Sequence, residues 1–190
     1  NELKADIPEL PDDKKKRFID EFKVSPYEAT ILVSDIETAK YFEEVVAKMG
    51  KNKDIKLAVN WITGELFAVL NNKNLEISQS PISAKNLAKL VNLIKNGTIS
   101  GKIAKTIFEL MMDGDKDPQI IVEEKGLKQE SDPKALEALI DKIINDNREK
   151  AIEYKNGKEK LFGFFVGQAM KVSGGKANPQ LINEILKKKL

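Results

Sequence analysis

The chain has 190 residues, of which 41% are hydrophobic, enough to bury the core of one large domain or two small ones. It contains no cysteine and no histidine, which excludes disulfides, thiolate zinc sites, a cysteine nucleophile and catalytic triads with an imidazole base. The formal net charge of +2 is too small to indicate a partner. No apolar stretch reaches the roughly 18–20 residues of a membrane helix and no signal peptide is visible, so we expect a cytoplasmic protein.

Apolar residues recur at helical spacing along the chain, and polar residues mark where helices begin. The first clear start is Ser25-Pro26-Tyr27-Glu28, a capping box with proline at the first helical position. Asp54 opens a long apolar helix that contains Gly64, which we interpret as permitting close packing. Further helix starts are expected at Asp35, Ser83, Ser100, Asp117-Pro118, Asp132-Pro133 and Asn178-Pro179.

The fold class is predicted to be all-α, because no segment alternates apolar and polar residues for long enough to form a strand. The best domain boundary is the polar stretch 127–131, which lies between two capped helices. We therefore expect a helical domain over residues 1–128 and a small helical tail domain over residues 129–190.

An acidic loop, Asp113-Gly114-Asp115-Lys116-Asp117, is similar to the start of a calcium loop. That motif requires glycine at its sixth position, where this chain has Pro118. We interpret the three aspartates as solvated acids near helix ends and expect no metal site.

A second motif, Gly174-Gly175-Lys176, has part of the pattern of a phosphate-binding loop. The complete motif needs an earlier glycine where Met170 stands, a Ser or Thr where Ala177 stands, and a preceding strand, so nucleotide hydrolysis is rejected. Two interpretations remain open. The glycines form a tight turn with positive φ, the loop and the next helix N-terminus hold one phosphate of a nucleic acid, or both hold together.

The helix before this loop has two further features. Gly163 and Gly167 are four residues apart, and we interpret them as a small face against which a neighbouring helix packs. The aromatic residues Phe162, Phe164 and Phe165 could stack on bases, but they are more typical of a core.

Positive charge is concentrated at the end of the chain, where residues 155–190 hold eight lysines against Glu159 and Glu184. Such an asymmetry is expected of a segment that meets an anion, although scattered lysines usually form a solvated face. The residues alone leave both interpretations open. The lysines are Lys155, Lys158, Lys160, Lys171, Lys176, Lys187, Lys188 and Lys189.

Four stretches resemble one known family, with its motifs in order and at its spacing. They are AVNWITGELFAVLN (58–71), SGKIAKTIFELM (100–111), EEKGLKQESD (123–132) and GKEKLFGFFVGQAMKVSGGKANPQLINEILKKKL (157–190). The family is that of the GatB subunits of the bacterial aspartyl/glutamyl-tRNA amidotransferases, and the last third is also similar to the YqeY-type proteins. The resemblance covers roughly the whole chain.

This resemblance implies a role in a ligase that converts Glu-tRNA(Gln) or Asp-tRNA(Asn) to the amidated form. Glutamine supplies ammonia through the amidase subunit of the ligase, and subunits A and C are the implied protein partners. ATP and magnesium act in an N-terminal domain of the family that is outside this chain. We therefore expect no catalytic residue, metal or cofactor in the chain itself.

The resemblance also implies that the YqeY-like tail domain meets tRNA(Gln) or tRNA(Asn) near the elbow of the tRNA. The rival hypothesis is a non-catalytic interaction module that docks onto partner subunits through apolar helix faces, and a free-standing enzyme is the third. The expected tRNA-binding residues are Lys158, Lys160, Lys171, Gly174, Gly175, Lys176 and Asn178.

Overall fold

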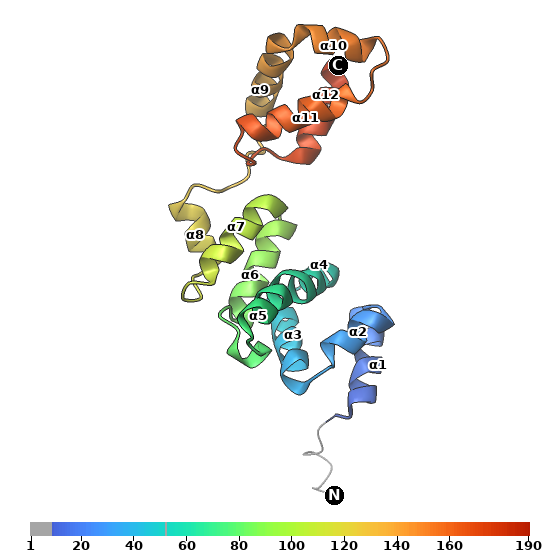
Figure 1. The fold of residues 1–190 in the computed structure, drawn as a ribbon, viewed down its shortest axis with the longest axis vertical. Helices are drawn as coiled ribbons and strands as arrows, with labels where there is room; N and C mark the ends of the chain where they lie inside the picture. The colour runs from blue at the N-terminus through green and yellow to red at the C-terminus, as the bar shows by residue number, and fades with distance from the viewer. Residues whose placement is uncertain (1–8, 52) are drawn as a thin grey trace, which may run out of the picture. The chain divides into compact units, whose positions relative to one another are not determined.

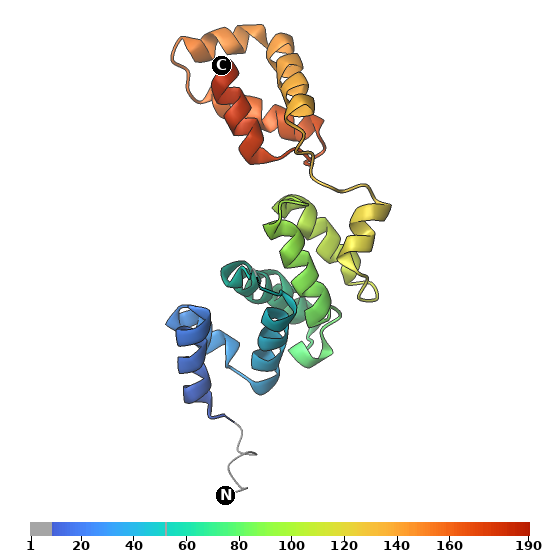
Figure 2. The same ribbon diagram turned by 180° about the vertical axis from the view of Figure 1, so that it is seen from behind.

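The computed structural model describes residues 9–51 and 53–190, and these residues form helices and no strand (Figures 1 and 2). The prediction of an all-α fold is confirmed. Among the described residues, no helix has both the length and the apolar character that a membrane span requires. The elements are α1 (Pro11–Phe22), α2 (Pro26–Leu32), α3 (Ile36–Lys48), α4 (Ile55–Asn60), the π-helix η1 (Trp61–Leu66), α5 (Phe67–Lys73), the 3-10 helix η2 (Ile77–Gln79), α6 (Ala84–Lys95), α7 (Gly101–Met111), α8 (Pro118–Glu124), α9 (Pro133–Asp146), α10 (Arg148–Lys155), α11 (Leu161–Val172) and α12 (Pro179–Lys189).

The predicted caps begin the helices as expected. The hydroxyl of Ser25 accepts from the amide of Glu28 at 3.2 Å, and the Glu28 carboxylate accepts from the amide of Ser25 at 2.7 Å. Carboxylates of Asp35 and Asp54 accept from amides in the first turns of α3 and α4. Each cap satisfies amides that the helix itself leaves unpaired.

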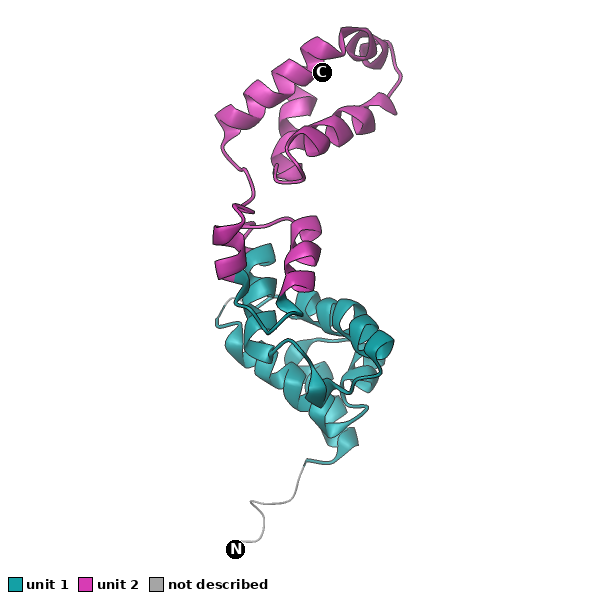
Figure 3. Cartoon of the chain, turned by 60° about the vertical axis from the view of Figure 1, so that its left-hand side comes forward, with its two compact units in different colours: residues 1–95, 111–118 teal, residues 96–110, 119–190 magenta. Residues whose placement is uncertain are grey.

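The chain divides into two compact units, which Figure 3 distinguishes by colour. The first unit comprises residues 1–95 and 111–118, of which residues 1–8 and 52 are outside the description. Its core joins α1 to α3 through Phe18, Phe22 and Phe42, whose ring centroids lie 5.1–5.3 Å apart. The apolar face of α3 also packs against α6.

The long helix expected after Asp54 is present over 55–73, but its middle is the π-helix η1. Trp61, Ile62 and Leu66 of this wide turn are all buried. Gly64 is exposed, and a Cβ added there meets no atom of the described residues within 4 Å. The interpretation that Gly64 permits close packing within the chain is therefore wrong.

The acidic loop is structural, and its aspartates are not simply solvated. A carboxylate oxygen of Asp115 accepts from the amide of Ser83 at 3.0 Å, while its carbonyl accepts from the side chain of Asn86 at 2.8 Å. Asp117 forms an ion pair with Lys89. The loop thus ties the region before α8 to the start of α6, all within the first unit.

The second unit comprises residues 96–110 and 119–190. Within it, α9, α11 and α12 pack on one another, and α10 packs against α9 and α11. These helices share a core of their own, in which the largest buried side chain is Phe165. The buried members of this tail core are Leu136, Ile140, Ile143, Ala151, Phe165, Ala169, Ala177, Ile182, Ile185 and Leu186.

The predicted domain boundary lies inside the second unit. Gln129 donates its amide to the carbonyl of Thr98 at 2.6 Å, and Glu130 donates its amide to the carbonyl of Lys176 at 2.7 Å. The polar stretch before α9 is therefore hydrogen-bonded both to the residues before α7 and to the loop before α12. The division into domains 1–128 and 129–190 stays a prediction.

Candidate nucleic-acid interface

The candidate site is loop 173–178, which joins α11 to α12. Gly174 and Gly175 have φ angles of 61° and 80°, a region that favours glycine. The amide of Gly175 bonds to the carbonyl of Met170 at 2.8 Å, and that of Gly174 bonds to the carbonyl of Lys171 at 3.1 Å. This pair of bonds is a Schellman motif, which satisfies the last carbonyls of α11 and reverses the chain.

The remaining amides of the loop also have partners within the chain. Lys176 donates to the carbonyl of Ser173 at 3.1 Å, and Ala177 donates to the hydroxyl of Ser173 at 3.2 Å. Asn178 donates to the carbonyl of Glu130 at 3.0 Å. Because these amides are engaged, the structure favours a tight turn over a backbone cradle for phosphate. An anion at this loop would therefore be bound by side chains and not by backbone amides.

Asn178 begins α12, as the sequence predicts. Its side-chain oxygen accepts from the amides of Gln180 and Leu181 at 3.0 and 3.4 Å, and its side-chain nitrogen lies 3.5 Å from the hydroxyl of Ser131. The amide oxygen of Asn178 is thus committed to capping, which leaves it a positioning role at the loop.

Two residues that sequence reasoning missed hold the loop in place. Ser100, the cap of α7, donates its hydroxyl to the carbonyl of Gly175 at 3.2 Å. Glu130 donates its backbone amide to the backbone carbonyl of Lys176 at 2.7 Å. Lys102 lies beside the loop, because its Cδ would be 3.5 Å from a Cβ added at the buried Gly175. No sequence pattern links residues 75 positions apart, so only the fold brings Ser100 and Lys102 to this loop.

The predicted lysines fall at the two ends of α11. Lys171 and Lys176 lie at its C-terminal end, whereas Lys158 and Lys160 lie before its first residue. A helix of 12 residues is about 18 Å long, so one phosphate cannot meet both groups. Lys158 also pairs with Glu153 at 3.0 Å, which reduces the positive charge at that end.

The glycines of α11 do not meet a neighbouring helix. Gly163 and Gly167 are exposed, and within the described part of the chain a Cβ added at either meets nothing within 4 Å. The interpretation of a small packing face is therefore wrong for the described chain. By helical spacing the two glycines share one stripe with Lys160 and Lys171, so the backbone of α11 is accessible between two lysines.

The phenylalanines of α11 belong to the tail core, as expected. Phe165 is fully buried, and Phe164 lies edge-on to it with ring centroids 5.4 Å apart. Phe162 packs near Tyr154 with centroids 6.1 Å apart. The amine of Lys150 lies 3.8 Å from the centroid of the Phe164 ring, a cation–π contact.

A comparison with protein families matches residues 40–190 to the GatB domain. The chain belongs to the GatB domain family. The match covers most of the chain, including both the acidic loop and loop 173–178. It confirms the family resemblance of the four sequence stretches.

Several curated relatives of this GatB-domain chain carry the name of the B subunit of aspartyl/glutamyl-tRNA(Asn/Gln) amidotransferase. The protein from Pelagibacter ubique strain HTCC1062 is 95% identical over 188 residues, which cover 99% of this chain and 38% of that protein. The proteins from Rickettsia africae and Zymomonas mobilis are 52% and 48% identical to this chain across its whole length. The matched region covers 38% and 39% of those two proteins. The chain thus spans less than two fifths of these relatives.

Proposed function

We propose that this chain is the part of a GatB-type amidotransferase subunit that holds tRNA and performs no chemistry itself. The observation that carries the proposal is loop 173–178, an anchored turn with Lys171 and Lys176 at the end of α11 and Lys102 beside it. The names of the relatives supply the substrate class, a tRNA charged with aspartate or glutamate.

The complete protein would take part in converting Glu-tRNA(Gln) or Asp-tRNA(Asn) to the amidated form in the cytoplasm. In this proposal ATP and magnesium act elsewhere in the same GatB-type subunit, while subunits A and C of the amidotransferase are its protein partners. The residues of this chain contribute by binding, which is consistent with the absence of histidine and cysteine from its sequence.

Lysine side chains at a rigid loop suit recognition of RNA by its backbone. The grooves of A-form RNA are read mainly through shape, phosphates and 2′-hydroxyls, so ammonium groups can position a tRNA without reading its sequence. The bonds from Ser100 and Glu130 fix the loop before RNA arrives, which reduces the entropy cost of binding.

Binding of an unmodified tRNA(Gln) or tRNA(Asn) transcript by the 190-residue chain, measured by fluorescence anisotropy against salt, tests this proposal. We expect Lys171→Ala with Lys176→Ala to weaken binding and to flatten the plot of log K against log salt. Each phosphate that a variant no longer neutralises changes that slope by roughly 0.7–0.9.

A matched control is Lys134→Ala with Lys142→Ala, because these exposed lysines of α9 lie in the same unit and carry the same charge. The control pair should retain most of the affinity and the slope. Equal slopes for the loop pair and the control pair would show that loop 173–178 is not a specific contact.

The alternative function, docking onto a partner subunit, is favoured by one observation. Ile36 is 67% exposed and lines a hollow with Pro11, Val33 and Ala39 on the first unit. A module that only docks onto protein would bind tRNA weakly and equally in all the lysine variants. The same titration therefore separates the two functions.

A further inference from the structure

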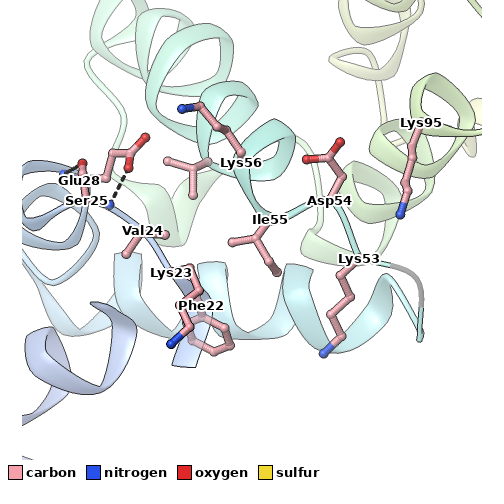
Figure 4. Close-up of a pocket in the computed structure, with 11 residues that line it drawn as sticks. Phe22, Lys23, Val24, Ser25, Glu28, Lys53, Asp54, Ile55, Lys56 and Lys95 are labelled. Carbon is pink, nitrogen blue, oxygen red and sulfur yellow. Dashed lines mark hydrogen bonds between the residues drawn. The ribbon is translucent and has the colours of Figure 1, made fainter. Parts of the chain in front are cut away.

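A second concentration of lysines surrounds a hollow of about 540 Å³ in the first unit, away from loop 173–178 in the sequence (Figure 4). The hollow lies among the end of α1, the start of α2, the start of α4 and the end of α6. Phe22, Val24, Ile55 and Val59 contribute apolar surface to it. The lysines that line it are Lys23, Lys53, Lys56 and Lys95.

The two carboxylates of the hollow are committed to helix caps. Glu28 accepts from the amide of Ser25 at 2.7 Å, and Asp54 accepts from the amide of Leu57 at 2.9 Å. The bond from Ser25, with a smaller contribution from the charge of Lys56, holds the pKa of Glu28 below its usual value. The hollow is thus lined by four lysines and two carboxylates, and lysines outnumber carboxylates in its lining.

Three of the lysines lie next to the ends of helices. Lys23 ends α1 with a φ of 57° and donates its amide to Ile19, Lys53 directly precedes the cap of α4, and Lys56 lies in the first turn of α4. Their side chains are exposed. Among the residues that the structure describes, none of these three amines lies within 4.0 Å of a carboxylate oxygen.

We propose that this lysine-lined hollow binds a phosphate of the RNA backbone together with its ribose, as a second tRNA contact of the chain. The volume exceeds what a single phosphate needs, and the apolar surface suits a sugar ring. Lysine is depleted at protein–protein interfaces, whereas interfaces with nucleic acid are rich in positive charge, so RNA fits better than a protein partner. The inference rests on the proposed tRNA-binding function and adds a site to it.

The test is the same anisotropy titration with the triple variant Lys23→Gln, Lys53→Gln and Lys56→Gln. Because the phosphate in the hollow is then no longer neutralised, the steepness of the salt plot should fall by roughly 0.7–0.9. Replacing the same three lysines by arginine keeps the charge and should retain the affinity of the natural chain. The control triple removes three exposed lysines of the first unit that do not line the hollow, Lys16, Lys73 and Lys85.

The outcomes separate the hollow from the loop. A reduced slope for the hollow triple, with the loop pair Lys171→Ala and Lys176→Ala unchanged, supports the hollow and overturns the loop. A hollow triple that matches its control, with a weakened loop pair, overturns the hollow alone.

Two further probes cover other ligands. If the hollow triple matches its control for tRNA but loses binding of oligoglutamate, the hollow is a protein-docking site and the inference is wrong. If it loses only binding of AMP, the hollow is a free-nucleotide site and the RNA contact is likewise wrong. Circular dichroism of each variant, with a melting temperature close to that of the natural chain, confirms that the comparison concerns folded proteins.

Discussion

At the scale of single residues, the glycines of the second unit have opposite roles. Gly174 adopts a φ of 61°, which a residue with a Cβ adopts only at a cost, so the turn after α11 depends on it. Gly163 and Gly167 are helical and exposed, and a Cβ added at either meets no atom of the described residues within 4 Å. Nothing in the fold of the described chain requires glycine at these two positions.

We therefore predict that Gly163→Ala and Gly167→Ala each raise the free energy of unfolding by about 0.8–1 kcal/mol, because alanine is the better helix former and meets no obstacle. Gly174→Ala, as the contrasting variant, should lower it by about 1 kcal/mol or more. Urea denaturation followed by circular dichroism measures all three. A loss of stability in Gly163→Ala would mean that a Cβ there meets something in the folded chain.

At the scale of elements, the cap of α3 connects stability to pH. One oxygen of the Asp35 carboxylate accepts from the amide of Thr38 at 2.8 Å, and the other accepts from its hydroxyl at 2.6 Å. Burial is the largest single effect and raises the pKa of Asp35. The bonds from Thr38 and the hydroxyl of Ser34 together outweigh it and bring the pKa below its usual value.

The folded chain favours the ionised form of Asp35, because its pKa is lowered there. The contribution of Asp35 to the free energy of unfolding is therefore complete above the usual aspartate pKa, and it is lost as the pH falls through the lowered pKa. Asparagine caps helices about as well as aspartate but does not titrate in this range. We predict that the natural chain exceeds Asp35→Asn in stability at pH 7, and that the difference shrinks as the pH falls below about 4. Parallel urea unfolding curves at a series of pH values measure it. A difference that stays constant would exclude Asp35 as the titrating cap.

The caps were the part of the fold that the sequence predicted best. Each capping side chain accepts from an amide two or three residues further along the chain, so a short sequence pattern is enough to predict it. The caps are Ser25, Asp35, Asp54 and Asn178. Helix α10 was not predicted because residues 148–155 are mostly polar and show no apolar stripe. The π-turn at Trp61–Leu66 was missed for another reason, since both helix types give a similar apolar pattern over so short a run.

The candidate site was predicted less completely than the helices. Local signals identified Gly174, Gly175 and Asn178, but their geometry makes them parts of a turn and a cap. The approach of Ser100 and Lys102 to the loop depends on tertiary packing, which no local pattern encodes. The lysine-lined hollow of the first unit was missed for the same reason, because its lysines are separated by up to 72 positions.

At the scale of the whole molecule, the question is whether the tail helices fold by themselves. The tail core lies entirely within α9 to α12 and the loops between them, which favours independence. Hydrogen bonds from Gln129 to Thr98 at 2.6 Å and from Ser100 to Gly175 at 3.2 Å join this region to the residues around α7. Each bond of this kind contributes on the order of 1 kcal/mol, which is a small part of a domain's stability.

We predict that residues 129–190, produced alone, unfold cooperatively in urea with helical circular dichroism at low denaturant. Their stability should be marginal, because a chain of about 60 residues buries only about 60% of its unfolded surface. Phe165→Ala, which removes the largest side chain of the tail core, should cost about 3–5 kcal/mol and abolish the transition. Val172→Ala is the control, since Val172 is 60% exposed and its truncation should leave the transition nearly unchanged. A non-cooperative melt of the unsubstituted piece would mean that the boundary at 128/129 is wrong and that the residues around α7 belong to the folding unit.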